Sequence, residues 1–148
     1  MKIRVAVPDD LEQLLVLFKG YLEFYQMDFK ERDCADFLKE RLAKSDSVII
    51  VAENLTPTGL TGFAQLYPSF SSLRQKKSWI LNDLFVAPTW RGQGIGQVLV
   101  KFIQQYSLES QAKGISLQTG KENKEAQRLY EMNGWKRDEN YFTYHFTH

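Results

Sequence analysis

A glycine-rich turn is the stretch of this chain best suited to chemistry. In residues 91–96, Arg-Gly-Gln-Gly-Ile-Gly, alternate glycines free the backbone for positive φ and for close approach of another molecule. From Ile95 onward, apolar residues recur at the spacing of one helix face, so a helix begins at this turn. The first turn of a helix carries unpaired N–H groups and the positive end of the macrodipole. The turn therefore predicts an anion site, with a phosphate group as its natural occupant.

Spacing excludes two other classes of phosphate-binding loop. A P-loop requires Gly-Lys-Ser/Thr, but no lysine follows Gly94 or Gly96. A dinucleotide fingerprint requires Gly-x-Gly-x-x-Gly, and its last position is Gln97 when counted from Gly92 or Leu99 when counted from Gly94. Neither class fits.

Two motifs resemble those of the GNAT superfamily of N-acetyltransferases. Residues 91–96 are similar to its Arg/Gln-x-x-Gly-x-Gly/Ala signature. Asn123 at a helix start, Tyr130 two turns on and Gly134-Trp135 after it resemble the other signature. Asn123 and Tyr130 are placed to share one face of that helix. With a similar order of elements, the resemblance covers essentially the whole chain.

The elements that must position these motifs follow from periodicity and turn residues. We expect strands near residues 3–7, 47–53, 60–67, 79–86, 115–119, 135–136 and 141–146, and a polar loop at 69–77. Helices are expected near residues 11–25, 33–44, 95–114 and 123–133, the third closing at Lys113-Gly114. The resemblance implies one GNAT domain over residues 1–148, of the α/β (α+β) class. Its central sheet would be mixed, mostly antiparallel, with about seven strands, four flanking helices and a splayed central pair.

The resemblance also implies acetyl-coenzyme A as cosubstrate. The glycine turn would hold its pyrophosphate, and the strand before the turn would pair with its pantetheine arm and supply an oxyanion donor. The residues expected to bind it are Leu84, Phe85, Val86, Arg91, Gly92, Gln93, Gly94, Ile95, Gly96, Gln97, Asn123, Ala126 and Tyr130.

Acetyl transfer to an amine needs a base for the amine and an acid for the departing sulfur. Tyr130 is the expected acid and Asp83 the expected base. Relatives that acetylate diamines and polyamines carry Glu-Asp where this chain has Asn82-Asp83. Because an amide cannot accept a full proton, three alternatives stay open: Asp83, a carboxylate such as Glu23 acting through water, or deprotonation of the amine in solution.

The acceptor side is expected at residues 21–29, where aromatic residues alternate with carboxylates and suit an ammonium group. The expected substrate contacts are Glu23, Tyr25, Asn82 and Asp83. Residues 21–25 read equally well as the end of a core stripe. A small primary amine, such as a diamine, polyamine or amino acid, is the favoured acceptor. A protein or peptide acceptor and a catalytically silent acyl-coenzyme A binding module are the alternatives.

The charge balance and the residue composition limit the classes of partner that we expect this chain to bind. The chain has 148 residues, and 19 Lys and Arg against 18 Asp and Glu leave a net charge of +1, so no overall field favours nucleic acid or a membrane. The chain has a single cysteine, Cys34, and only two histidines, His145 and His148, so we expect no metal site. We expect a cytoplasmic protein, and the resemblance implies a homodimer.

Overall fold

The computed structural model describes residues 1–148, which separate into two compact units, Met1–Gln118 and Thr119–His148. The first unit contains the sheet and the first three α-helices, and the second contains α4 (Lys124–Met132). The elements of the first unit are β1 (Lys2–Val5), the 3₁₀ turn η1 (Pro8–Asp10), α1 (Leu11–Phe24), α2 (Glu31–Lys44), β2 (Val48–Leu55), β3 (Thr58–Ser71), β4 (Lys76–Val86), η2 (Pro88–Trp90), α3 (Ile95–Glu109) and β5 (Ile115–Ser116).

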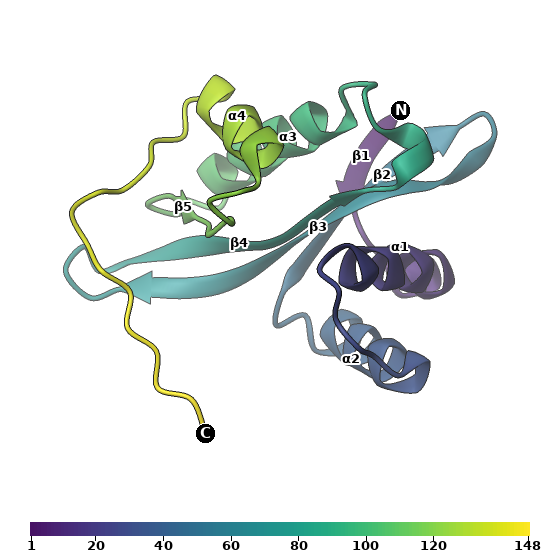
Figure 1. Cartoon of the computed structure of the whole chain (residues 1–148), viewed down its shortest axis with the longest axis horizontal. Coiled ribbons are helices and arrows are strands. Elements are labelled where there is room, and N and C mark those ends of the chain that lie inside the picture. Colours follow the sequence, from purple (N-terminus) through teal and green to yellow (C-terminus); the bar gives the residue numbers. More distant parts are fainter. The chain divides into compact units, whose positions relative to one another are not determined.

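The sheet of the first unit has five strands in the order β1-β2-β3-β4-β5. The neighbours from β1 to β4 are antiparallel, and β4 and β5 are parallel. In Figure 1, α1 and α2 lie against one face of this sheet and α3 crosses the other. The expectation of a mixed, mostly antiparallel sheet is confirmed.

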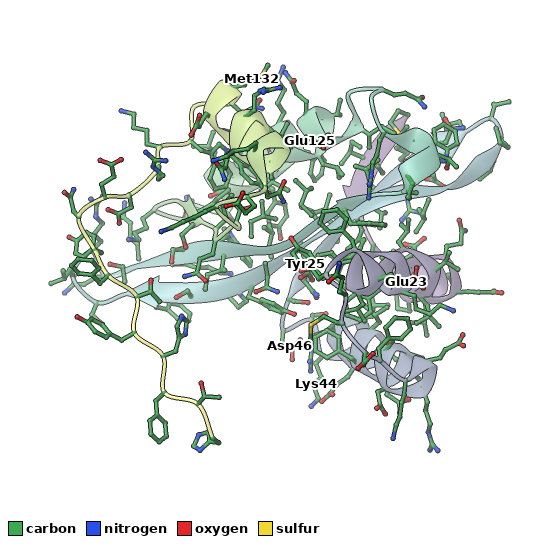
Figure 2. The ribbon with its side chains drawn as sticks, viewed as in Figure 1. Glu23, Tyr25, Lys44, Asp46, Glu125 and Met132 are labelled. Carbon is green, nitrogen blue, oxygen red and sulfur yellow. The ribbon has the colours of Figure 1, made fainter.

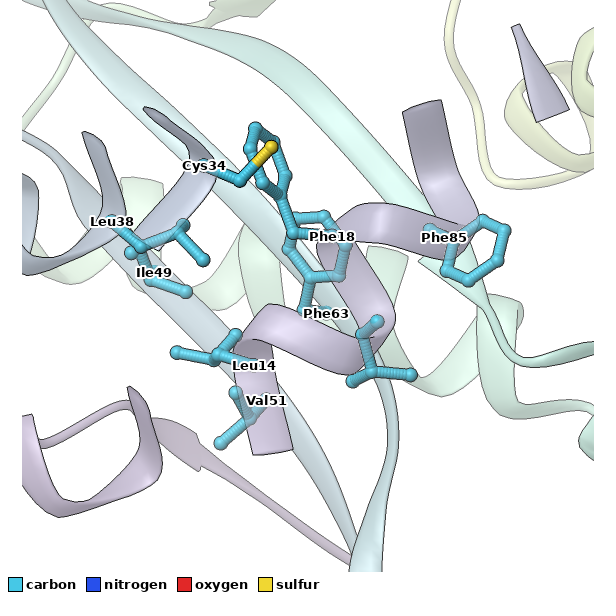
Figure 3. Close-up of a cluster of buried hydrophobic side chains, with 9 residues drawn as sticks. Leu14, Phe18, Cys34, Leu38, Ile49, Val51, Phe63 and Phe85 are labelled. Carbon is cyan, nitrogen blue, oxygen red and sulfur yellow. The ribbon is translucent and has the colours of Figure 1, made fainter. Parts of the chain in front are cut away.

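The core between α1, α2 and the sheet follows from matching apolar patterns. The stripe of α1 meets alternate inward residues of β2, β3 and β4, which is how a helix and a sheet bury one face each. Figure 3 shows this cluster, whose buried members are Leu14, Leu17, Phe18, Cys34, Leu38, Ile49, Val51, Phe63 and Phe85. A Cβ at Gly20 would stand 3.0 Å from Phe85 Cζ, so the glycine lets the ring lie against α1.

An ionic cluster fastens the start of α1 to the sheet. Arg4 of β1 donates two hydrogen bonds to the carboxylate of Asp10, each 2.8 Å long, and a third of 3.0 Å to Glu53 of β2. The buried Asp10 carboxylate also accepts from the Val7 N–H. The Arg4 guanidinium is the main reason that the pKa of Asp10 lies below its usual range.

The expectation of about seven strands is wrong, because the structure has five. The segments 135–136 and 141–146 are not strands. The Trp135 N–H bonds to the Tyr130 carbonyl at 3.1 Å and so closes the end of α4. Residues 141–146 alternate like a strand, but a strand exists only where a neighbour satisfies its N–H and C=O groups. Four aromatic side chains there are more than four-fifths exposed, namely Tyr141, Phe142, Tyr144 and Phe146.

Several boundaries in the first unit also differ from expectation, and β5 ends at Ser116 instead of at residue 119. Much of the stretch predicted as a polar loop at 69–77 is strand, because β3 and β4 pair out to Ser71 and Lys76. Helix α3 ends at Glu109 instead of running on to Lys113-Gly114. Gln111, with φ of +59°, takes the left-handed position expected of the glycine. The Lys113 N–H then bonds to the Lys77 carbonyl at 2.8 Å, so the chain has already turned toward β4.

Candidate active site

A β-bulge interrupts β4 at Asn82. Leu81 pairs with Leu66 of β3 and Asp83 pairs with Gln65, so Asn82 has no partner across the strand pair. A bulge inserts one residue into one strand, bends it and increases its twist. The side chains before and after Asn82 therefore follow different phases of alternation.

The two halves of β4 face opposite sides of the sheet as a result. Before the bulge, the Trp79 ring packs against Tyr106 of α3, with centroids 5.8 Å apart. After the bulge, Phe85 joins the core under α1. Asp83 lies two residues before Phe85 in a regular strand, so its carboxylate also faces α1. The bulge thus carries a carboxylate to the face that α1 and α2 cover.

One edge of β4 is open over its second half. The Trp79 N–H bonds to the Gly114 carbonyl at 3.0 Å, and the pairing with β5 covers only Trp79 and Ile80. From Leu81 to Val86 no strand of this sheet lies along that edge. The pairing between the two parallel strands is therefore limited to two residues of each strand.

Backbone direction identifies the donors on the open edge. The Ala87 N–H points toward β3, where it bonds to the Thr61 carbonyl at 2.8 Å. Because N–H groups alternate between the two edges of a strand, those of Leu84 and Val86 point away from β3. Phe85, also predicted to bind the cosubstrate, instead lies buried in the core.

The glycine turn is built around two left-handed residues. Gly92 and Gly94 have φ of +75° and +79°, and a Cβ at either would meet nothing within 4 Å. Glycine is therefore required by the backbone conformation and not by crowding. The residues around these glycines, Arg91 and Gln93, have exposed side chains.

The N-terminus of α3 presents unobstructed donors. Gly94 is its N-cap, no side chain caps it and no acidic residue lies in its first turn. The first helical bond runs from the Val98 N–H to the Gly94 carbonyl at 3.1 Å. The N–H groups of Ile95, Gly96 and Gln97 precede it and have no acceptor within the helix. This arrangement fits an anionic group such as a pyrophosphate.

Arg91 links the turn to the end of β4. Its Nε donates to the Val86 carbonyl at 2.9 Å, which satisfies the acceptor beside the open edge. Its guanidinium lies over the rings of Phe24 and Phe85, 5.6 and 5.3 Å from the two centroids. Arg91 therefore fixes the position of the turn relative to α1.

Asp83 sits in a buried chain of hydrogen bonds. Gln65 Nε2 donates to Asp83 Oδ2 at 2.8 Å, and Asn82 Nδ2 donates to Oδ1 at 2.9 Å. Ser47 in turn donates to Gln65 Oε1 at 2.9 Å, which fixes the orientation of the amide. Both side-chain amides are neutral donors, so they hold the carboxylate in place without neutralising its charge.

Burial and the Asp83 carboxylate raise the pKa values of two tyrosines. Burial raises the pKa of the Tyr21 phenol, and the Asp83 charge and hydrogen bond raise that pKa further. Burial and then the Asp83 charge raise the pKa of Tyr67 to about 12. Both phenols therefore keep their protons near neutral pH. The hydroxyl groups of both residues can therefore donate hydrogen bonds without ionising.

The acceptor segment predicted at residues 21–29 contains the end of α1. Tyr25 is half exposed, and its ring packs edge-on against Tyr21 and Phe24 at 5.0 and 5.1 Å. Glu23 is exposed on α1 (Figure 2), and no ion pair or hydrogen bond joins its side chain to Asp83. The Tyr21 ring packs against the core, and its hydroxyl interacts with Asp83.

The second unit holds the other motif. Asn123 is the N-cap of α4, and its Oδ1 accepts from the Ala126 N–H at 3.2 Å. Tyr130 lies two turns further along, with its ring 5.6 Å from that of Trp135. Gly134, with φ of +86°, ends the helix and lets the chain fold back at Trp135. The order Asn, Tyr, Gly-aromatic therefore describes one capped helix and its closing turn.

Sequence reasoning missed Gln65 and Tyr67. Gln65 is fully buried within the apolar run Phe63-Ala64-Gln65-Leu66, where a polar residue requires a partner. That conflict is a signal for a site, but it does not name the partner. The pairing with Asp83 depends on the register of β3 and β4.

No group of three or more His, Cys, Asp or Glu side chains is placed to hold a metal ion. None of the helices combines the length and the apolar character needed to cross a membrane.

Comparison with known families identifies the fold. The family model described as the acetyltransferase (GNAT) family matches residues 12–135. The chain belongs to the GNAT acetyltransferase family. GNAT enzymes use acetyl-coenzyme A as cosubstrate, and the open edge of β4 and the uncapped start of α3 fit such a molecule. This chain is therefore an acetyl-coenzyme A-dependent acyltransferase.

Relatives within the GNAT family match along most of their length. An N-acetyltransferase of Bacillus subtilis (strain 168) is 40% identical over 144 residues, covering 97% of this chain and 95% of that protein. A thialysine N-epsilon-acetyltransferase of Bos taurus is 31% identical over 145 residues, covering 89% and 82%. The crystal structure of a probable acetyltransferase, 37% identical, superposes with a TM-score of 0.94 over 99% of this chain and 97% of that one.

Proposed function

We propose that this GNAT protein transfers the acetyl group of acetyl-coenzyme A to the primary amine of a small molecule, with Asp83 as the base. The observation that carries the proposal is that two neighbouring residues of β4 supply a carboxylate and a backbone N–H donor. Asp83 offers a buried carboxylate on the α1 face, and Leu84 offers an N–H on the open edge. A nitrogen beside the carboxylate could reach a carbonyl bound at that edge.

The base has a defined task. An amine with a pKa of about 10.4 loses its proton at pH 7 at a cost of roughly 4.6 kcal/mol. Asp83 accepts two hydrogen bonds from neutral amides, and burial strengthens its interaction with an ammonium group. Glu23 is exposed and lacks such partners, so burial favours Asp83 over Glu23. Asn82 contributes a donor that positions Asp83 and takes no proton.

The ammonium group gives one proton to Asp83. The nitrogen then bonds to the acetyl carbon while the carbon–sulfur bond breaks, and the Leu84 N–H stabilises the oxyanion. Tyr130 gives its proton to the departing sulfur and regains one from the nitrogen. The products are the acetylated amine, the free thiol and one proton.

The coenzyme sites are part of the same proposal. The N–H groups at 95–97 would hold the pyrophosphate, with Gly92 and Gly94 shaping the turn and Arg91 and Gln93 bordering it. The N–H group of Val86 would pair with the amide-containing arm, while that of Leu84 would face the acetyl carbonyl. The family resemblance adds Asn123, Ala126 and Tyr130 of α4 as further proposed coenzyme contacts.

The acceptor is proposed to be a small amine that enters beside Tyr25 and Asn82. The half-exposed Tyr25 ring and the carboxylate of Asp83 suit an ammonium group. The relative named for N-epsilon acetylation of thialysine supports an acceptor whose amine ends a side chain. The dimer implied by the resemblance is likewise a proposal, which the mass of the protein in solution will decide.

The test is a thiol-release assay with acetyl-coenzyme A against diamines, polyamines, amino acids and lysine peptides. Coenzyme binding is measured beside it by calorimetry. We expect turnover with a small amine and loss of most of it in Asp83→Asn. Tight coenzyme binding without turnover on any amine would refute the proposal and favour a silent acyl-coenzyme A binding module.

A further inference from the structure

A pocket opens on the α1 and α2 side of the sheet, and of its lining residues only Tyr67 belongs to the site described above. It has a volume of about 280 Å³ and is lined by Phe37 and Arg41 of α2, by Asp46 and by Tyr67 of β3. Asp46 stands in the turn between α2 and β2. In Figure 2, Asp46 and Tyr25 lie at the same end of the helix pair α1 and α2. The pocket is therefore a second recessed surface on the acceptor side of the molecule.

Its charges are paired and held in place. Arg41 Nε donates to Asp46 Oδ1 at 2.8 Å, and Arg41 Nη2 lies 3.4 Å from Glu40 Oε2. The Arg41 guanidinium also lies over the Phe37 ring, 4.9 Å from its centroid. The Arg41 side chain is 16% exposed and that of Asp46 is 45% exposed. One fixed cation and one accessible anion thus stand side by side in the wall.

Tyr67 connects this pocket to Asp83. Tyr67 and Gln65 are two residues apart on β3 and face the same side, so their side chains leave the strand roughly 7 Å apart. Gln65 bonds directly to Asp83. Tyr67 lines the pocket together with Arg41 and Asp46, and after burial the Asp83 charge is what most raises the pKa of its phenol. Tyr67 thus lines the pocket and is the next residue on this face of β3 after Gln65, which holds Asp83.

We propose that the pocket binds the α-ammonium and α-carboxylate groups of a free basic amino acid while its side-chain amine reaches Asp83. Arg41 receives the carboxylate and Asp46 receives the ammonium group, with Tyr67 flanking the stem. This inference rests on the proposed function and names the class of its acceptor. Neither simpler head group fits as well. A lone distal ammonium would meet the Arg41 guanidinium, and a lone carboxylate would meet Asp46 and Glu40.

Three amines of similar length test the assignment. L-lysine carries both head groups, cadaverine lacks the carboxylate and 6-aminohexanoate lacks the α-ammonium. We expect kcat/KM to be highest for L-lysine, by about 10- to 100-fold over each of the others, since one charge-assisted hydrogen bond separates each pair.

Variants assign each head group to its residue. Arg41→Gln should bring the ratio of L-lysine to cadaverine close to one, and Arg41→Lys should restore part of it. Asp46→Asn should bring the ratio of kcat/KM for L-lysine to that for 6-aminohexanoate close to one. Arg32→Gln is the matched control on α2, because its side chain is 91% exposed, and it should keep both ratios. Calorimetry with acetyl-coenzyme A verifies that each variant is folded.

The outcomes separate the two proposals. Turnover of all three amines with equal kcat/KM would overturn the head-group pocket and leave the acetyltransferase standing. Ratios that survive in Arg41→Gln and Asp46→Asn would overturn the pocket as well. Coenzyme binding with no turnover of any amine would overturn the proposed function and this inference with it.

Discussion

The carboxylate of Asp83 and the side-chain amide of Gln65 form a buried hydrogen bond between adjacent strands, with Oδ2 and Nε2 2.8 Å apart. The two residues are paired across β3 and β4, and each is less than one-twentieth exposed. A buried carboxylate held by neutral donors keeps its charge available to an incoming cation. Four experiments test this relationship and other features described above.

Replacing Asp83 by Asn removes the proposed base with little change in shape. We expect kcat/KM at pH 7 to fall by about 10²- to 10⁴-fold. The remaining rate should rise with pH toward the amine pKa of about 10.4, because only free amine reacts. Steady-state assays across pH measure both effects. Asp36→Asn, at an exposed carboxylate on α2, is the control and should retain activity. Equal rates in Asp83→Asn and the wild type at pH 7 would remove Asp83 from the base role.

Replacing Tyr130 by Phe removes the proposed acid and keeps the ring that packs on Trp135. We expect kcat to fall by about 10²-fold, since a thiolate is a fair leaving group without assistance. Coenzyme affinity, measured by calorimetry, should change little. Tyr144→Phe provides a matched control, because that ring is 89% exposed. An unchanged kcat in Tyr130→Phe would show that the sulfur leaves unassisted.

Replacing Gly94 by Ala places a Cβ on a residue with φ of +79°. The space is open, so the effect is conformational, at about 1–2 kcal/mol for a left-handed residue. We expect weaker coenzyme binding by about 10-fold, because the start of α3 must shift to relieve the strain. Gly120→Ala is the control, since that glycine is also uncrowded and lacks a positive φ. Equal affinities in both variants would argue against coenzyme binding at this turn.

The Arg4–Asp10 cluster predicts loss of stability in acid. The folded pKa of Asp10 is lowered, so its contribution is complete above the unfolded pKa of about 3.9 and disappears as the pH falls through the folded value. Denaturant unfolding between pH 7 and pH 2 should show a steeper loss below about pH 4 in the wild type than in Asp10→Asn. At pH 7 the variant should be less stable by about 1.5–3 kcal/mol. Asp9→Asn, at an exposed carboxylate, should follow the wild type.

Features set by neighbouring residues were predictable from the sequence. The start of α3 at Ile95, the left-handed glycines before it and the cap of α4 at Asn123 depend on local backbone chemistry. Each is encoded within a few residues. Residues 91–96 alone were therefore enough to predict an anion site at the turn.

Features set by contacts between distant residues were not predictable. The end of α3 is fixed at Ser110, whose hydroxyl accepts from Trp79 Nε1 at 2.9 Å across 31 positions of the sequence. Gln65 and Asp83 are 18 positions apart and meet only through the register of β3 and β4. Residues 141–146 were wrongly predicted as a strand. Their alternation is typical of a strand, but no neighbouring strand pairs with them. Local pattern cannot supply a partner.

The bulge at Asn82 is a one-residue insertion in β4. Deleting that residue would leave the side chains on both faces of β4 where they are. Deleting Asn82 would leave Leu81 opposite Leu66 and Asp83 opposite Gln65, as they already are. What would disappear is the bend, since a regular strand is straighter than a bulged one. The shortened β4 could then run along β5 for more of its length and gain ladder bonds. A protein with this deletion would have a longer β4–β5 pairing and a lower activity, because β5 would occupy the edge at which the cosubstrate is proposed to bind.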